Sequence, residues 1–333
     1  MPHAPYSILT SHFSTGVQDL RLMKISVIIP TYRRPQSLAV CLEALRQQTR
    51  LADEIIVIVR DSDLETRQLL ELASFTTNFI RIVKVTHPGI VAALNAGLDV
   101  VKGDILAITD DDTAPHPEWL ARIEAHFLAD ETIGGVGGRD FIYHQQKLHQ
   151  GSASVVGKVQ WFGRVIGNHH LGVGEPREVE VLKGANMSYR RQAIGNLRFD
   201  ERLKGTGAQV HNDLAFSLRV KQLGWKLVYD PLVSVEHYHA PRFDEDQRYQ
   251  FNYLAMVNKV HNETITLLEY LTPVRRLIFL IWGIFVGTRD HWGLVQCLRF
   301  LPRRGTIAIQ TWLASLQGQW QGWQTWRQSH RQA

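Results

Sequence analysis

Three consecutive aspartates, Asp110, Asp111 and Asp112, follow a short apolar run in the stretch ILAITDDDTAPHPEW. Carboxylates this close repel one another, so the cluster is costly unless a cation lies beside it. A helix N-cap would account for one aspartate, but not for three behind a buried strand. Hard divalent cations bind carboxylate oxygens, commonly together with substrate phosphates. The cluster therefore predicts a metal site that holds a phosphorylated ligand.

The aspartates follow one of several predicted strands that end in polar residues. The segments at these ends are PTYRR (30–34), VRDSD (59–63), THPGI (86–90) and TDDDT (109–113). Open α/β sheets bind ligands at the carboxyl ends of their strands. Two of these ends are strongly acidic and would repel a phosphate. A divalent cation between the carboxylates and the phosphate would remove this repulsion.

Apolar runs alternate with segments of helical spacing over the first 130 residues. The runs predict strands in 25–29, 53–59, 79–85 and 104–109, and the spacing predicts helices over 35–48, 63–73, 89–101 and 116–130. This alternation indicates an α/β fold, with a mainly parallel central sheet flanked by helices.

After residue 130 the alternation loosens. GGVGG (134–138) and the residues through Gly174 predict loops and irregular strands around a site. A helix over 212–224 and a strand over 226–230 follow, and we expect Pro231 to end that strand.

The composition is that of a globular protein large enough for one large domain or two ordinary ones, with 44% hydrophobic and 21% charged residues. Its two cysteines, Cys41 and Cys297, are far apart, which excludes a disulfide framework and favours a reducing, cytoplasmic compartment. The first twenty residues lack an apolar segment after a basic start, so we expect no secretory signal there.

The last fifth of the chain differs from the rest. Residues 271–333 contain eight arginines, one acid and six of the nine tryptophans, for a net charge of +7. The uncharged run 277–288 is too short to span a bilayer, because a transmembrane helix needs about 20 apolar residues. In the segment 312–326 four tryptophans and Leu316 recur at spacings of three and four, which predicts one stripe on a helix.

This tryptophan stripe, flanked by arginines, predicts a helix lying on an anionic membrane surface, and the protein is then peripheral on the cytoplasmic face. Packing back onto the preceding domain and oligomerisation through the stripe are the alternatives. We expect no nucleic-acid partner, because few lysines accompany the tryptophans.

Six segments in order resemble family 2 of the inverting glycosyltransferases, whose fold is the nucleotide-diphospho-sugar-binding GT-A fold. They are SVIIPTYRRPQSLAVCLEAL, ADEIIVIV, GIVAALNAGL, DILAITDDDTAPHPEWL, LKGANMSYRR and FDERLKGTGAQVHNDLAFSLRVKQLGWKLVYDP. Any one is weak, but six in order with sensible spacing are a strong signal. The resemblance implies a flexible extension over 1–23, a GT-A domain over 24–240 and a basic helical region over 241–333.

The resemblance also implies residue roles on the donor side. Pro30, Thr31, Arg33 and Asn95 would bind the nucleotide sugar, Asp110 and Asp111 would face its ribose and sugar, and Asp112 would bind Mg²⁺ or Mn²⁺. The family's second strand usually ends in Asp-Asp-Gly-Ser, but here it reads Val59-Arg60-Asp61-Ser62. Asp61, or Asp63, would then read the base.

On the acceptor side, the resemblance makes Asp213 the general base, which takes a proton from the attacking hydroxyl. Family members commonly have Glu-Asp where this chain has Asn212-Asp213. His237 would complete the metal site, with His239 as its local competitor, and imidazole suits Mn²⁺ better than Mg²⁺. Gly184 and Asn186 would contact the acceptor or the donor sugar.

The sequence thus predicts a metal-dependent inverting glycosyltransferase. The donor would be a UDP-, GDP- or dTDP-linked sugar, and the acceptor a hydroxyl of a glycan or lipid-linked molecule. A nucleotidyltransferase would be expected to have a glycine-rich loop after the first strand, which PTYRRPQ lacks. A non-catalytic sugar-nucleotide-binding or assembly module remains the second alternative, because Arg60 and Asn212 stand where acids are expected.

Overall fold

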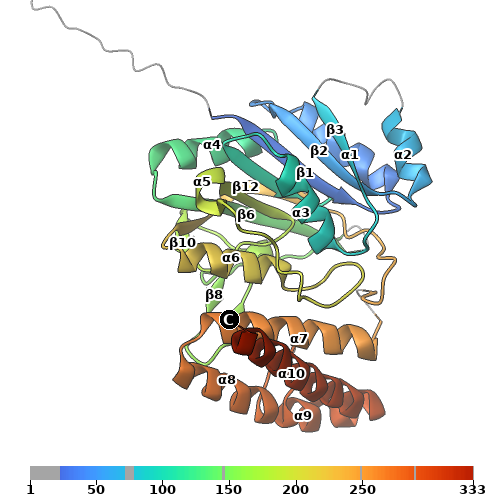
Figure 1. The fold of residues 1–333 in the computed structure, drawn as a ribbon, viewed down its shortest axis with the longest axis vertical. Helices are drawn as coiled ribbons and strands as arrows, with labels where there is room; N and C mark the ends of the chain where they lie inside the picture. The colour runs from blue at the N-terminus through green and yellow to red at the C-terminus, as the bar shows by residue number, and fades with distance from the viewer. Residues whose placement is uncertain (1–22, 72–78, 145–146, 248–249, 289, 333) are drawn as a thin grey trace, which may run out of the picture.

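The computed structural model describes residues 23–71, 79–144, 147–247, 250–288 and 290–332. The extension predicted over 1–23 lies outside the described residues except for Met23, as does the end of the helix predicted over 63–73. The chain forms a layered α/β body with a separate layer of helices packed at one end (Figure 1).

The first half of the chain alternates strands and helices as predicted. Its elements are β1 (Ile25–Thr31), α1 (Pro35–Arg46), β2 (Glu54–Arg60), α2 (Leu64–Glu71), β3 (Ile80–Val85), α3 (Ile90–Val100) and β4 (Ile105–Thr109). Strands β3, β2, β1 and β4 pair in that order, and all three pairings are parallel. Residues of β1, β2 and β4 are buried on both faces, as expected for a parallel sheet covered by helices.

The second half extends the sheet with mixed pairings. Its elements are β5 (Thr113–Pro115), α4 (Trp119–Ala129), β6 (Ile133–His144), β7 (Lys147–Leu148), β8 (Lys158–Val159), β9 (Val165–Ile166), the 3₁₀ helix η1 (His169–Leu171), β10 (Arg177–Val179), β11 (Asn186–Arg190), α5 (Arg191–Ile194), α6 (Asn212–Gln222) and β12 (Lys226–His237). The sheet order is β10-β12-β6-β11-β4-β1-β2-β3. Antiparallel β11 separates β4 from β6, and β12 pairs parallel with β6.

The GGVGG segment, predicted to be loop and irregular strand, is part of the long interior strand β6. Its glycines allow close approach of neighbouring backbone: a Cβ at Gly138 would lie 1.7 Å from the Val233 carbonyl oxygen. Glycine inside a strand often marks such an approach. The loop part of the prediction was wrong, because tertiary packing overrides the low β-propensity of glycine, whereas the pairing of β6 with β12 does shift register at Gly134.

The strand predicted to end at Pro231 continues to His237. Its pairing with β6 shifts register between Asp230 and Val235, and Pro231 lies in this irregular stretch, where a ladder hydrogen bond is not needed. The continuation has a functional consequence, because it carries His237 to β5, where it pairs with Thr113.

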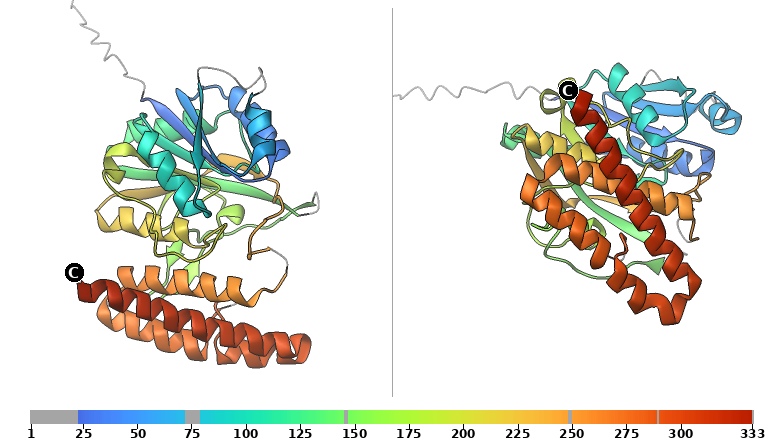
Figure 2. Two further views of the ribbon diagram at one scale, coloured as in Figure 1. Left: turned by 45° about the vertical axis from the view of Figure 1, so that its right-hand side comes forward. Right: turned by 60° about the horizontal axis from the view of Figure 1, so that its bottom comes forward.

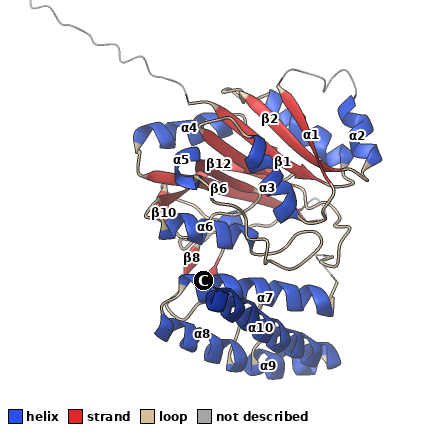
Figure 3. Cartoon of the chain, viewed as in Figure 1, coloured by secondary structure: helices blue, strands red, loops and turns tan. Residues whose placement is uncertain are grey.

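The C-terminal region is helical, with α7 (Tyr253–Tyr270), α8 (Pro273–Phe285), α9 (Leu294–Arg304) and α10 (Thr306–Gln332). Helix α7 lies nearest the sheet body and α10 packs along it, while α8 and α9 form the end farthest from the sheet (Figures 1 and 2). The described strands all precede α7 in the chain, and the described residues of the helical layer form no strand (Figure 3). None of the described helices combines the length and apolar composition needed to cross a bilayer.

The predicted tryptophan stripe lies on α10, but most of it faces the protein. Trp312 packs against the small cluster of Trp292, Cys297 and Ala308, and Trp323 and Trp326 pack onto the core beneath α7 and α8. Only Trp320 of the stripe is largely exposed, at 57%. For the stripe itself, packing back onto the chain is therefore the alternative that the structure supports.

Helices α7 and α10 approach closely at Gly318, where a Cβ would lie 2.5 Å from the Val257 carbonyl oxygen. Alanine is the better helix former by about 1 kcal/mol, but overpacking typically costs about 1–3 kcal/mol. We expect Gly318→Ala to lower the free energy of unfolding by about 1–2 kcal/mol in urea denaturation. Gln324→Ala, at an exposed position of the same helix, is the control. A stabilised Gly318→Ala protein would contradict this close packing.

Candidate active site

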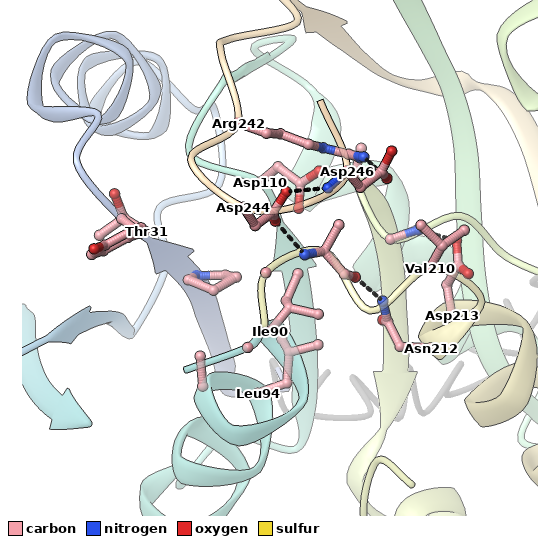
Figure 4. A pocket seen from close by; sticks show the side chains of 18 of the residues that line it. Thr31, Ile90, Leu94, Asp110, Val210, Asn212, Asp213, Arg242, Asp244 and Asp246 are labelled. Atoms are coloured by element: carbon pink, nitrogen blue, oxygen red, sulfur yellow. Dashed lines mark hydrogen bonds and ion pairs between the residues drawn. The ribbon is translucent and has the colours of Figure 1, made fainter. Parts of the chain in front are cut away.

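A cavity of about 600 Å³ opens at the carboxyl ends of the parallel strands. Its volume is in the range of small-molecule sites. The lining residues come from the ends of β1, β2 and β4, the start of α3, the loop before α6 and the segment after β12. In Figure 4, Thr31 lies at the end of β1, Asp213 at the start of α6, and Asp110 between them. The strand ends that the sequence singled out therefore do meet at one pocket.

The three aspartates differ in burial. Asp110 lines the cavity, while Asp111 is fully buried and Asp112 is 2% exposed. Arg34 contacts both buried carboxylates, with Nη2 3.0 Å from Asp111 Oδ1 and Nη1 3.3 Å from Asp112 Oδ2. Burial raises the pKa of Asp111 to about 7, and the positive charge of Arg34 opposes that rise. Sequence reasoning chose Arg33 for the pocket and missed Arg34, the next residue.

Asp110, Asp112 and His237 form a group that could hold a metal ion. One ligand atom from each lies within 4.8 Å of the others, and His237 Nε2 is 3.3 Å from Asp112 Oδ1. Two carboxylates and one imidazole are a reasonable donor set for a divalent cation such as Mn²⁺. His239, the local competitor, also lines the cavity, its ring 4.5 Å from that of His237.

A buried carboxylate behind His237 holds the imidazole in place. Asp140 Oδ2 lies 3.4 Å from His237 Nδ1, and the Lys183 ammonium pairs with the same carboxylate. Burial alone would raise the pKa of Asp140, but Lys183 and His237 outweigh it and hold the pKa below its ordinary value. A histidine oriented by a carboxylate through its other nitrogen is typical of metal ligands. Asp140 lies in none of the quoted sequence segments, and Lys183 lies in LKGANMSYRR but received no predicted role.

Asp213 lies in the first turn of α6 and lines the cavity. Its Oδ2 accepts a hydrogen bond from the Gly184 N–H at 3.1 Å, and its Oδ1 accepts one from the Leu214 N–H at 2.8 Å. These contacts fix the direction of the carboxylate and place Gly184, predicted to contact the acceptor or the donor sugar, beside Asp213. His211, just before the helix, has a φ of 76°, a left-handed conformation uncommon for a non-glycine residue.

The pocket wall near β1 and β2 differs from the predicted set. Pro30 and Thr31 line the cavity, together with Tyr32 and Arg60. The Arg60 guanidinium lies over the Tyr32 ring at 4.1 Å. Arg60 thus lines the pocket at the end of β2, where the family usually has acids.

Three polar residues predicted to contact the nucleotide or considered for it lie outside this wall. Arg33 does not line the cavity, and its N–H donates to the carboxylate of Asp63. Asp63 is 2% exposed and also caps α2 by accepting from the Thr66 N–H. Asp61 is exposed and also outside the lining. The geometry gives Asp63 a structural role in the turn between β2 and α2.

The two predicted asparagines are both buried and hydrogen-bonded to the protein. Asn95 donates to the Phe199 carbonyl at 3.0 Å and accepts from the Phe199 N–H at 2.8 Å. Asn186 accepts from the Trp119 indole at 2.8 Å and donates to the Val233 carbonyl at 2.8 Å. Neither lines the cavity. The Asn95 amide thus links α3 to the segment of Phe199, and the Asn186 amide links β11 to α4 and β12.

The cavity extends beyond residue 240, where the sequence placed the end of the domain. Arg242, Phe243, Asp244 and Asp246 line it. Asp244 accepts from the Ala208 N–H at 2.8 Å, and Phe243 meets the Tyr32 ring edge-on at 6.3 Å. The segment after β12 therefore covers both the nucleotide-side wall and the loop before α6.

A parallel-cored α/β sheet with a buried acidic cluster at its carboxyl edge is the arrangement of the GT-A fold. The chain belongs to glycosyl transferase family 2, whose model matches residues 26–197. Glycosyltransferase AglE of Haloferax volcanii is 31% identical over 116 residues, which are 34% of this chain and 36% of AglE. The match therefore spans about a third of that relative.

Two further proteins match over longer stretches. The glucosyl-dolichyl phosphate glucuronosyltransferase of Haloferax volcanii is 22% identical over 225 residues, 65% of this chain and 69% of that relative. Among solved structures, the mannosyltransferase PcManGT from Pyrobaculum calidifontis, in complex with GDP-Man and Mn²⁺, aligns with a TM-score of 0.53 at 16% identity. The alignment covers 90% of this chain and 87% of PcManGT, which confirms the predicted fold class.

Replacing Asn95 by alanine tests whether this residue supports the fold or contacts a ligand. The change leaves both backbone groups of Phe199 unpaired in a buried place, so we expect the free energy of unfolding to fall by about 2 kcal/mol. Urea denaturation measures the loss, and nucleotide-sugar affinity of the folded variant should stay unchanged. Asn196→Ala, at an exposed position on the segment that carries Phe199, is the control. An unaltered stability with weaker donor binding would return Asn95 to the ligand site.

Proposed function

We propose that the protein is a metal-dependent inverting glycosyltransferase that uses a nucleotide-diphospho-sugar donor. The observation that carries this proposal is the convergence on one cavity of an Asp110–Asp112–His237 group and a separate, backbone-oriented carboxylate, Asp213. The first can hold a cation and a diphosphate, and the second can accept a proton. The catalytic unit would then run from about residue 24 to the end of the covering segment at Asp246, with the helices beyond it as a separate region.

The donor would lie along the cavity from β1 toward α6. Pro30, Thr31, Tyr32 and Arg60 would contact the nucleotide, with Arg60 and Tyr32 taking the place of the acidic base reader. Asp110 and Asp111 would face the ribose and the sugar of the donor. The complex of PcManGT with GDP-Man and Mn²⁺ supports a nucleotide-sugar donor in a fold of this kind, and UDP-, GDP- and dTDP-sugars are the candidate donors.

Asp110, Asp112 and His237 would hold Mn²⁺ or Mg²⁺, with Asp112 as a direct ligand. When bound, such an ion neutralises negative charge on a diphosphate leaving group. Arg34 and the Asp140–Lys183 pair belong to the same arrangement. Arg34 compensates the buried charge of Asp111 and Asp112, and Asp140 keeps His237 turned toward Asp112.

Asp213 would act as the general base. It would take the proton from the acceptor hydroxyl as that oxygen attacks the anomeric carbon from the side opposite the leaving group, which inverts the centre. The Gly184 N–H holds one carboxylate oxygen, so the side chain is oriented before the acceptor arrives. A single carboxylate suffices for this transfer, so Asn212 in place of a second acid does not weaken the assignment.

The acceptor would be a hydroxyl of a glycan or of a lipid-linked molecule. The name of the glucuronosyltransferase relative, which specifies a glucosyl-dolichyl phosphate, supports the lipid-linked class. We propose that the enzyme works in the cytoplasm, where its two cysteines would remain reduced; both are buried and free.

Asp213→Asn separates a base from a binding residue. The amide keeps the shape and one hydrogen-bond acceptor but cannot take a proton, so turnover should fall about 10²–10⁴-fold while donor affinity changes little. Steady-state transfer rates and donor titration measure the two effects. Asp61→Asn, exposed and outside the cavity, is the matched control. Turnover equal to that of the control would remove the base assignment and favour a non-catalytic binding module.

Asp140→Asn tests the support of His237 apart from catalysis. Loss of an orienting carboxylate behind a ligating histidine typically weakens metal affinity about 10–100-fold. Mn²⁺ binding followed by electron paramagnetic resonance measures this without any donor, and chelation by EDTA should abolish transfer. Asp99→Asn, on an exposed carboxylate paired with Arg198, is the control. Wild-type Mn²⁺ affinity in the Asp140 variant would argue that His237 does not bind the ion.

A further inference from the structure

Helix α8 lies at the end of the molecule farthest from the sheet (Figures 1 and 2). It carries a row of exposed apolar side chains. Its members, with exposed fractions from 37% to 70%, are Val274, Leu277, Ile281, Ile284 and Phe285. Their spacing places them on one face of the helix. The opposite face is packed, with Phe279 and Gly283 buried. The exposed row therefore belongs to a well-docked helix.

Helix α9 and the start of α10 continue the pattern. Val295, Leu298 and Leu301 on α9 are 50%, 58% and 36% exposed, and Ile309 and Leu313 on α10 are 42% and 45% exposed. With the row on α8, they make the outer apolar face of the helical layer. Exposed apolar residues gathered on neighbouring helices mark an interaction surface more strongly than scattered ones.

The inside of the same layer contains buried polar groups beside its apolar clusters. Glu263 of α7 is buried and pairs with His291 at 2.7 Å, and Gln319 of α10 is buried and donates to the Leu280 carbonyl at 2.9 Å. Ser315 is buried and accepts from the Trp292 N–H at 3.1 Å. The layer thus buries a pair of ionisable residues and exposes leucine, isoleucine and valine, the reverse of what water favours. An apolar phase against the outer face would account for this distribution.

The charge of the region identifies that phase. Residues 271–333 contain eight arginines and a single acid, Asp290, which pairs with Lys259 at 2.8 Å. Arg299, Arg303 and Arg304 are exposed on α9, the first two along one side of its apolar row. Apolar side chains bordered by arginines suit the boundary between lipid headgroups and acyl chains in a membrane that contains anionic lipid.

We propose that the outer face of α8 and α9 docks onto an anionic lipid bilayer as a peripheral contact. Leu277, Ile281 and Leu298 insert below the headgroups, and Arg299 and Arg303 contact lipid phosphates. This assigns the membrane contact to α8 and α9 in place of the tryptophan stripe of α10. A second copy of the chain fits the face less well, because two such faces would oppose like charges with one acid each to compensate.

The docking would also place the cavity toward the membrane side, which bears on the acceptor and rests on the proposed function. Lys259 of α7 lines the cavity, and α7 lies between the sheet body and the outer helices. A lipid-linked acceptor held in the bilayer would then be one helical layer from the catalytic carboxylate. The lipid contact itself does not depend on catalysis and can be tested alone.

Vesicle sedimentation of the full chain tests the contact. Vesicles of phosphatidylcholine with phosphatidylglycerol should bind the protein, and vesicles of phosphatidylcholine alone should bind it at least tenfold less. The double variant Leu277→Ser/Leu298→Ser should lose at least tenfold in binding to the anionic vesicles. The matched control is Leu64→Ser/Leu232→Ser, two leucines of similar exposure on the sheet body. Equal binding by both double variants would overturn the proposal.

A charge variant tests the arginines separately. Arg299→Gln/Arg303→Gln should weaken binding to anionic vesicles by about fivefold per arginine, and the effect should shrink at high salt. Arg81→Gln/Arg198→Gln, on exposed arginines of the sheet body, should bind like the wild type. Light scattering of the same proteins reads the oligomeric state. A dimer that the leucine variant dissociates, without vesicle binding by the wild type, would assign the face to self-association and sink the lipid contact.

Discussion

The site depends on compensation of buried negative charge. Asp111, Asp112 and Asp140 are almost fully removed from water, and an isolated carboxylate in such a place would be strongly destabilising. Arg34 on one side and Lys183 on the other supply the opposing charge, and His237 lies between Asp112 and Asp140. The chain of contacts runs from Arg34 through Asp112, His237 and Asp140 to Lys183. A cation bound at Asp110 and Asp112 would strengthen this balance at the edge that faces the cavity.

The sheet topology brings that chain of contacts together. Parallel strands β1 and β4 deliver Arg34 and the three aspartates to one edge, as any open α/β sheet would. The other half comes from the mixed region, where β6 supplies Asp140 and β12 runs beside it to supply His237. The irregular pairing around Pro231 separates the part of β12 that pairs with β6 and β10 from the part that pairs with β6 and β5. This second part places an imidazole opposite an aspartate about 125 residues away in the sequence.

Sequence reasoning predicted the regular part of this arrangement well. The β-branched runs and helical spacings identified β1 to β4 with their helices, and strand-end polarity located the cavity with Thr31 and Asp110. Asp213 and His237, which also line it, came from the resemblance to the family. It failed where tertiary packing overrides local preference. The glycines of β6 are typical of a loop, and only the fold shows that Val233 packs against Gly138. Asn95 was predicted as a ligand contact, and only the fold shows its hydrogen bonds to Phe199. Arg34, Asp140 and Lys183 gave no local signal, because their role is to balance charges that only the fold brings near.

The C-terminal helices show the same limit from the other direction. Their sequence has a surplus of arginine and tryptophan, which correctly sets the region apart from the rest of the chain. Most tryptophans at helical spacing, however, pack α10 against the rest of the chain. The structure moves the exposed apolar area to α8 and α9, whose leucines and isoleucines look like ordinary core in the sequence. Polar pairs such as Glu263 with His291 lie inside the layer beside its apolar clusters, where hydrogen bonds between fixed partners satisfy them. Exposing the apolar side chains of the outer face to water is unfavourable, and covering them with lipid would remove this cost. This is the physical reason to propose a lipid contact there.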